Sequence, residues 1–146
     1  MTVMIHDQKQ VLLAAVERIR PEVERGSDEG ESLRTLPAAT VRALSDSGLF
    51  SMKLPEVLGG MEADLITQYE VVEAMAYVDA SAGWCLMIGA TSIAIPGAYL
   101  PEAAIAEVFE DHRIPLAATS VLPTGCASRR SCAALWRSQP MRHSTS

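Results

Sequence analysis

The sequence lacks the features that mark several common protein classes. Aromatic residues make up only 5% of its 146 residues, so aliphatic side chains and methionine must form most of the core. The formal net charge of −6 argues against binding of nucleic acid, whose phosphates require a basic surface. The three cysteines have no regular spacing, so no disulfide framework is expected. A basic segment followed by an apolar run is missing at the N-terminus, which predicts a cytoplasmic protein without a signal peptide.

Motifs for a self-sufficient catalytic or metal site are also missing. The sequence contains neither G-x-G-x-x-G nor G-x-x-x-x-G-K-[ST], so no phosphate-binding loop of a known pattern is present. The three histidines are isolated and lack the spacing of metal ligands, and Cys126 and Cys132 indicate zinc only weakly. Asp64 and Asp79 precede helical stretches and are interpreted as helix caps. We therefore expect no metal and no catalytic residue in this chain.

Apolar periodicity predicts an all-α bundle of about five helices. We expect the first helix over His6–Arg25, ended by Gly26 and followed by a polar loop to Glu31. Its buried face is predicted to hold Leu12, Val16, Ile19 and Val23.

The second helix is expected to begin at Pro37, because a first-turn residue does not need its N–H. Val41 and Leu44 are its predicted buried stripe, and Gly48 is placed for a left-handed cap. The structured loop that follows is predicted to fold back onto the bundle through Leu49, Phe50, Met52 and Leu54.

Asp64 is the predicted N-cap of a third helix that ends near Val78. The 3.6-residue period indicates a buried face made of Leu65, Tyr69, Val72 and either Met75 or Ala76.

A stretch without any charged residue, 80–101, contains the predicted fourth helix. This helix is expected to be capped by Asp79 or Ser81, to run from Ala82 to Ile95 and to be ended by Pro96. It is apolar all round, which predicts a central, buried element. Four small residues should allow neighbouring helices to approach it closely: Ala82, Gly83, Gly89 and Ala90. The stretch is long enough to span a membrane, but its glycines and prolines favour a helix inside a bundle over a membrane span.

A fifth helix is predicted after Pro101, with Ile105, Val108 and Phe109 on its apolar side. Leu116–Val121 is partly β-branched and leads into a turn, so it is interpreted as the first strand of a β-domain whose remainder is missing. The predicted organisation is a helical domain over 1–113, the start of a β-domain over 114–125 and an irregular tail over 126–146.

The tail differs in composition from the rest of the chain. Residues 1–125 hold all 18 acidic residues and eight of the 12 basic ones, whereas residues 126–146 hold four arginines and no acid. A basic interaction tail or a disordered end would have this composition. A third hypothesis is that residues 126–146 are read out of frame, which translation of the other two frames after Gly125 would test.

Four segments between Leu36 and Gly125 resemble the N-terminal region of the acyl-CoA dehydrogenase superfamily. They are the helix opened by Leu36-Pro37 and closed by SGLF, the loop LPEVLGGMEAD, the pair of helices VVEAMAYVDASAGWCLMIGATS, and LAATSVLPTG. The segments SAGWCLMIG and SVLPTG look like the flavin-dependent monooxygenases of this superfamily. Leu122 stands where the ordinary dehydrogenases usually have a glutamate, which counts against a CoA-ester dehydrogenase.

This resemblance implies a two-component hydroxylase that is truncated here and inactive alone. In the family, a separate flavin reductase supplies reduced flavin (FAD or FMN), which reacts with O₂ and oxygenates a small-molecule substrate. The resemblance implies flavin contacts from Ser120, Val121 and Thr124. It also implies a substrate-pocket wall formed by Trp84, Met87, Ile88 and Thr91, for which plain core packing is the alternative. Because most flavin-binding regions of the family have no counterpart in the sequence, the chain alone is expected to bind no flavin.

Three alternatives remain at this stage. The chain could belong to an acyl-CoA dehydrogenase that oxidises a CoA ester, could be a stand-alone helical interaction module, or could associate with a membrane. A domain that lacks its neighbours is expected to expose apolar surface on the fourth helix and therefore to aggregate or to form a homo-oligomer.

Overall fold

The structure is a computed structural model that describes residues 2–109, with side-chain environments from Asp7 onward. The predicted strand Leu116–Val121 and the predicted tail lie outside the described residues. The described part is all-α, as predicted, with helices α1 to α5 and two short 3-10 turns, η1 and η2. Their bounds are α1 Thr2–Leu33, α2 Ala38–Asp46, η1 Leu49–Lys53, η2 Glu56–Leu58, α3 Leu65–Val78, α4 Ala80–Tyr99 and α5 Glu102–Val108.

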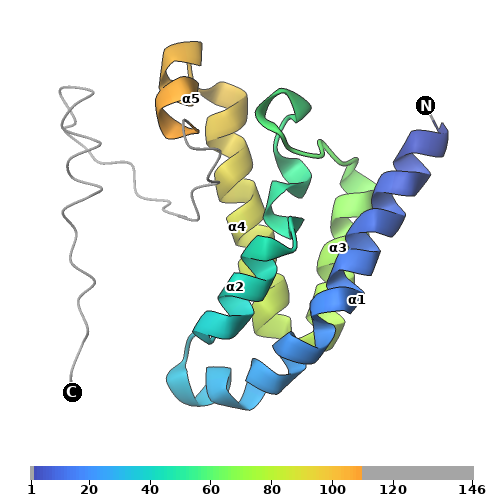
Figure 1. Ribbon diagram of the computed structural model, residues 1–146, viewed down its shortest axis with the longest axis vertical. Coiled ribbons are helices and arrows are strands. Elements are labelled where there is room, and N and C mark those ends of the chain that lie inside the picture. The colour runs from blue at the N-terminus through green and yellow to red at the C-terminus, as the bar shows by residue number, and fades with distance from the viewer. Residues whose placement is uncertain (1, 110–146) are drawn as a thin grey trace.

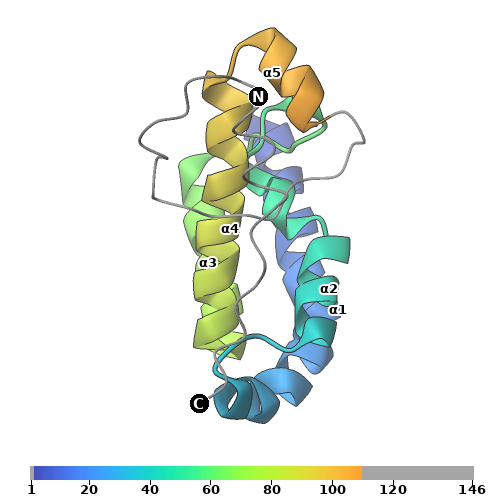
Figure 2. The same ribbon diagram turned by 90° about the vertical axis from the view of Figure 1, so that its left-hand side faces the viewer.

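The helices form an elongated bundle (Figure 1). Helix α3 packs against both α1 and α4, and α2 lies against α1. Helix α4 also contacts η1, so the turn after α2 closes one side of the core. Figure 2 shows α3 and α4 side by side, with α5 at the C-terminal end of α4. The core that these contacts enclose is mainly aliphatic, and Phe50 is its single buried aromatic residue within 7–109.

The predicted return of the segment after α2 is confirmed. All four of its named residues, Leu49, Phe50, Met52 and Leu54, are buried. Gly48 adopts the left-handed conformation with φ of 79°, which turns the chain from α2 into η1. The loop is closed again by a hydrogen bond from Ala63 N to Met52 O at 2.9 Å.

The predicted end of the first helix at Gly26 is wrong, because α1 continues to Leu33. A Cβ added at Gly26 would lie 2.4 Å from Thr40 Oγ1 and 3.3 Å from Pro37 Cγ. Gly26 therefore serves the close packing of α2 onto α1 rather than a helix stop. The same contact explains a second error: Thr40 is buried in α2, whereas the predicted core residue Val41 is 39% exposed.

The predicted end of the fourth helix at Pro96 is also wrong, because α4 continues to Tyr99. Proline has no backbone N–H, so the helix loses one hydrogen bond at this position. The next turn nevertheless forms, with Leu100 N donating to Pro96 O at 3.1 Å. Gly97 is buried there, and a Cβ on it would lie 2.7 Å from Leu54 Cδ1. Packing of this last turn on the loop thus keeps the helix intact beyond the proline.

The predicted face of the third helix is only partly right. Leu65 and Tyr69 are exposed, whereas Thr67, Val71 and Met75 form the buried stripe of α3. The apolar pattern predicted the wrong buried face because a threonine lies in the buried stripe of α3, while apolar residues also lie on its outer side. In α5, Ile105 is half-buried and Val108 is exposed, and Phe109, which follows the helix, is half-buried.

Both predicted aspartate caps are present. Asp64 Oδ1 accepts hydrogen bonds from Ile66 N at 3.0 Å and Thr67 N at 3.2 Å. Asp79 Oδ1 accepts from Ala82 N at 2.7 Å and caps α4, while Asp79 Oδ2 accepts from the Ser27 hydroxyl at 2.6 Å. Asp79 thus caps α4 and, through its hydrogen bond with Ser27, also links the start of α4 to α1.

Asp64 should make the stability of the domain depend on pH. Its hydrogen bond from the Thr67 hydroxyl, together with the backbone N–H groups of α3, holds the pKa of the Asp64 carboxyl below its ordinary value. A lowered folded-state pKa adds stability above the unfolded-state pKa, and this stability is lost as pH falls through the folded pKa. We expect Asp64→Asn to lose less stability than wild type between pH 7 and about pH 3. Urea unfolding at both pH values measures this, and equal losses would contradict the assignment.

Candidate functional site: the outward face of helix α4

The four predicted pocket residues, Trp84, Met87, Ile88 and Thr91, lie on one side of α4. Trp84 is 63% exposed, and the other three are half-buried. None of the four is among the buried core residues or the half-buried apolar residues packed against them, and a substrate wall at these positions stays a prediction. The opposite side of α4 carries the packing residues Ala82, Gly83, Leu86, Ala90, Ile93 and Gly97.

Helix α4 is fixed in place by close contacts of its small residues, as predicted. A Cβ at Gly83 would lie 2.8 Å from Ala76 Cα, and one at Gly89 would lie 2.5 Å from Phe50 Cε1. Helix α3 and turn η1 therefore approach the inner side of α4 closely. The outer face is consequently presented by a helix that cannot rotate without breaking both contacts.

Lys53 is a residue of this face that the sequence analysis did not single out. Its Nζ donates to Thr91 Oγ1 at 2.8 Å, and the Thr91 hydroxyl donates to Met87 O at 2.8 Å. Partial burial lowers the pKa of the Lys53 ammonium. One feature of the sequence could have pointed to Lys53, because it is the single charged residue in the largely apolar segment 47–55. The face therefore combines an apolar wall with one positioned ammonium group.

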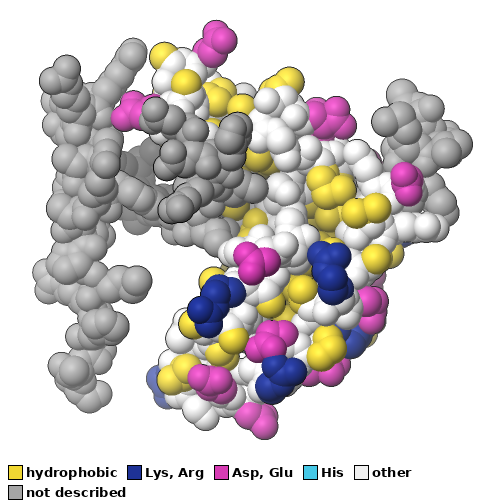
Figure 3. Space-filling view, in the orientation of Figure 1, with side chains coloured by type: hydrophobic (Ala, Val, Ile, Leu, Met, Phe, Trp, Pro, Cys, Tyr) yellow, Lys and Arg dark blue, Asp and Glu magenta, His cyan; other side chains and the backbone are white. Residues whose placement is uncertain are grey.

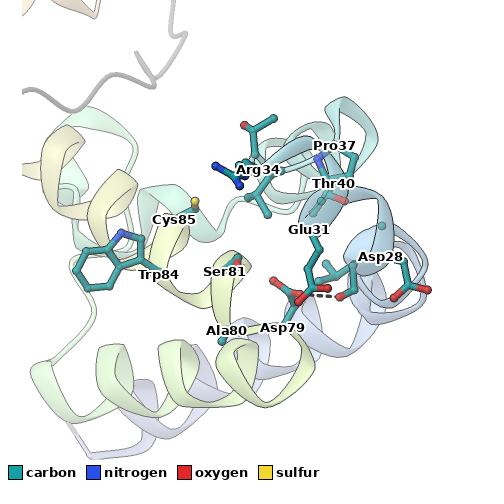
Figure 4. A pocket seen from close by; sticks show the side chains of 16 residues that line it. Asp28, Glu31, Arg34, Pro37, Thr40, Asp79, Ala80, Ser81, Trp84 and Cys85 are labelled. Atoms are coloured by element: carbon teal, nitrogen blue, oxygen red, sulfur yellow. Dashed lines mark hydrogen bonds between the residues drawn. The ribbon is translucent and has the colours of Figure 1, made fainter. Parts of the chain in front are cut away.

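A half-open cleft lies at the N-terminal end of α4. It has a volume of about 860 Å³ and is lined by the end of α1, the start of α2 and the first turns of α4. Figure 4 shows the carboxylates of Glu31 and Asp79 on one side of it and Trp84 on the other. Of the predicted pocket residues, only Trp84 lines the cleft. Within the described residues, no group of three or more potential ligands could hold a metal ion.

Cys85, beside Trp84, is not suited to act as a nucleophile. Desolvation raises the pKa of its thiol, and the Asp79 carboxylate adds to this effect. The thiol therefore stays protonated at neutral pH, whereas a reactive cysteine requires the thiolate. The predicted flavin contacts Ser120, Val121 and Thr124 lie outside the described residues and stay predictions.

Comparison with known proteins identifies the family. Residues 6–112 match the family described as acyl-CoA dehydrogenase, N-terminal domain. The chain belongs to this family. The resemblance inferred from the motifs of the sequence is thereby confirmed.

Two relatives of this chain are oxygenase subunits of flavin-dependent monooxygenases. Over 84 residues the chain is 36% identical to the oxygenase subunit HsaA of Mycobacterium tuberculosis, covering 58% of this chain and 21% of HsaA. It is 32% identical over 69 residues to HsaA of Rhodococcus jostii, covering 47% of this chain and 18% of that protein. The chain thus spans about a fifth of the length of these relatives.

A solved structure shows the same arrangement of helices. XiaF from Streptomyces, in complex with FADH2 and glycerol, matches with a TM-score of 0.69 and 32% sequence identity. The match covers 73% of this chain and 27% of XiaF. At this identity, both the fold and the relationship to flavin-dependent proteins are supported.

Family membership also bears on the membrane alternative. Helix α4, with a mean hydropathy of 1.3, is the one described helix long and apolar enough to cross a membrane. A core helix of a soluble protein has the same length and composition when it is mostly buried, but only 33% of the apolar span of α4 is buried. The prediction of a central, buried fourth helix is therefore wrong for its outward side, because the bundle packs α3 and η1 against one side of α4 only.

Proposed function

We propose that this chain provides the N-terminal helical domain of a reduced-flavin-dependent monooxygenase. The observation that carries the proposal is the match of the same helices to HsaA and to FADH2-bound XiaF, at 36% and 32% identity. The reduced flavin would supply the oxygen-activating chemistry, while the protein binds, orients and shields the reactants. The complete activity requires regions beyond the described helices.

In this proposal the outward face of α4 forms one wall of the substrate site. Trp84, Met87 and Ile88 offer an apolar surface, and Lys53 on Thr91 offers one fixed hydrogen-bond donor beside it. Such a wall suits a mainly apolar small molecule with one oxygen to be oriented.

The flavin is proposed to be FAD, which the FADH2 of the XiaF complex supports. Following the family resemblance, the flavin contacts of this chain are proposed to be Ser120, Val121 and Thr124, next to the bundle in sequence. The proposed partners are a separate flavin reductase and further copies of the oxygenase, in the cytoplasm.

A chimeric enzyme tests this function. Residues 6–112 would replace the matching N-terminal region of the Mycobacterium tuberculosis HsaA oxygenase subunit, and the chimera would be assayed with flavin, NADH and a flavin reductase. We expect substrate-dependent oxygenation above that of a chimera carrying Trp84→Ala and Ile88→Ala. A folded chimera that binds flavin but never oxygenates, or that instead oxidises CoA esters, would refute the proposal. Flavin titration of the unfused chain is the control, and no binding is expected.

A further inference from the structure

The sequence contains two lysines, Lys9 and Lys53, and the fold gives them different partners. Both side chains are half-buried. Lys9 Nζ on α1 forms an ion pair with Glu70 Oε2 of α3 at 2.5 Å. Lys53 forms no ion pair within the described residues, and its Nζ donates instead to the uncharged Thr91 hydroxyl at 2.8 Å. The Lys53 amine has therefore lost part of its water without gaining a carboxylate.

The surface around Lys53 is free of compensating negative charge. Helix α4, which Lys53 contacts, has no acidic or basic residue over 80–101. In the loop after Lys53, the Glu56 side chain is exposed, and Glu62 Oε2 accepts a hydrogen bond from Glu56 N at 3.2 Å. Elsewhere on the bundle the charges are mixed: on the visible face, basic side chains lie among acidic ones over the α1–α2 part (Figure 3). Lys53 thus places a single amine on an uncharged helix.

Apolar side chains flank the Thr91 hydroxyl that holds this amine. Met87 and Ile88 lie one turn before Thr91 and Ile95 lies one turn after it, at the spacings of three and four residues that make neighbours on a helix surface. Met87 and Ile88 are half-buried, and Ile95 is 53% exposed. All three therefore leave apolar surface open near the Lys53 amine, where an uncharged apolar molecule can bind.

We propose that Lys53 is a site of covalent modification by small, uncharged, apolar aldehydes. A lysine nitrogen forms an imine with carbonyl compounds, and desolvation beside an apolar surface activates it because the neutral amine becomes more abundant. Partial burial lowers the pKa of the Lys53 ammonium, which acts in the same direction. The apolar part of the aldehyde would lie on Met87 and Ile88. This inference requires only the folded bundle and does not depend on the proposed oxygenation.

The modification is a condensation without oxidation or reduction. The neutral Lys53 Nζ attacks the carbonyl carbon, so that a C–N bond forms and a carbinolamine results. The carbonyl oxygen then leaves as water with the two hydrogens of the amine, and a C=N bond remains. When this imine is protonated it carries one N–H, which Thr91 Oγ1 can accept as it accepts the ammonium N–H. The Thr91 hydroxyl proton does not interfere, because it is donated to Met87 O at 2.8 Å.

Competitive labelling of the full chain tests this site. Limiting benzaldehyde is added with sodium cyanoborohydride, which reduces the imine to a stable secondary amine, and peptide mapping by mass spectrometry gives the rates at both lysines. We expect Lys53 to react roughly tenfold faster than Lys9, because only Lys9 is paired with a carboxylate. Formaldehyde has no apolar body and should give a smaller ratio of the two rates. In concentrated urea the two lysines should react equally.

Two variants separate this site from ordinary lysine reactivity. Thr91→Glu gives Lys53 a carboxylate partner and should lower its rate to that of Lys9. Lys53→Arg keeps a donor for Thr91 but forms no imine, so it should remove this label and leave the label on Lys9 unchanged. Circular dichroism checks that both variants are folded.

Three outcomes would overturn the proposal. The first is equal rates at Lys53 and Lys9 in the folded wild-type chain, and the second is a Lys53 rate that a folded Thr91→Glu variant leaves unchanged. The third is a rate ratio with benzaldehyde no larger than the ratio with formaldehyde, because the apolar surface would then contribute nothing.

Discussion

Gly83→Ala is expected to destabilise the domain by about 2–3 kcal/mol, although alanine is the better helix former. A Cβ at position 83 would lie 2.8 Å from Ala76 Cα and 2.9 Å from Ala76 N. These are backbone atoms of α3, so the added methyl can be accommodated only by moving two helices apart. The helix-propensity gain of about 1 kcal/mol is smaller than the cost of this separation.

Gly89→Ala is the matched control in the same helix. Its added Cβ would meet the ring of Phe50, at 2.5 Å from Cε1, rather than backbone. A side chain can partly move aside, so we expect a smaller loss than at position 83. Chemical denaturation of both variants, read by far-ultraviolet circular dichroism, gives the comparison. Equal stabilities of wild type and Gly83→Ala would show that α3 and α4 are not in close contact there.

The elements that the sequence predicted correctly are those whose signals are local. Asp64 and Asp79 cap α3 and α4 because each stands two or three residues before N–H groups that need an acceptor. Gly48 turns the chain because glycine tolerates a positive φ. Such effects depend on a few neighbouring residues, so the amino-acid sequence alone is enough to predict them.

The errors at Gly26 and Pro96 have a common physical cause. Both residue types stop helices in isolation, and both were interpreted as stops. In the fold, the missing side chain of Gly26 leaves room for Thr40 of α2. Gly97 packs closely against Leu54 and so stabilises the turn after Pro96. Tertiary contacts between segments distant in sequence decided these ends, and periodicity carries no information about such contacts.

The candidate site was predicted only in part for the same reason. The position of Trp84, Met87 and Ile88 on one helical side follows from their spacing. Their spacing does not show which side of α4 faces outward, because every side of this helix is apolar. Lys53 reaches Thr91 across 38 positions of sequence, a contact that only the fold of the loop creates.

Truncation to alanine is expected to cost far more stability on the inner side of α4 than on its outward side. Leu86 is fully buried on the inner side, so Leu86→Ala should cost about 3 kcal/mol through lost apolar burial and a residual cavity. Ile88 is half-buried on the outward side, so Ile88→Ala should cost less than about 1 kcal/mol in the monomer.

Urea unfolding of both variants at low protein concentration measures the difference without a contribution from self-association. A larger loss for Ile88→Ala than for Leu86→Ala would mean that α4 is rotated and that its outward face is the core. In that case no substrate wall could be built from Trp84, Ile88 and Thr91. The ratio of the two losses therefore tests the structural assignment on which the proposed substrate wall rests.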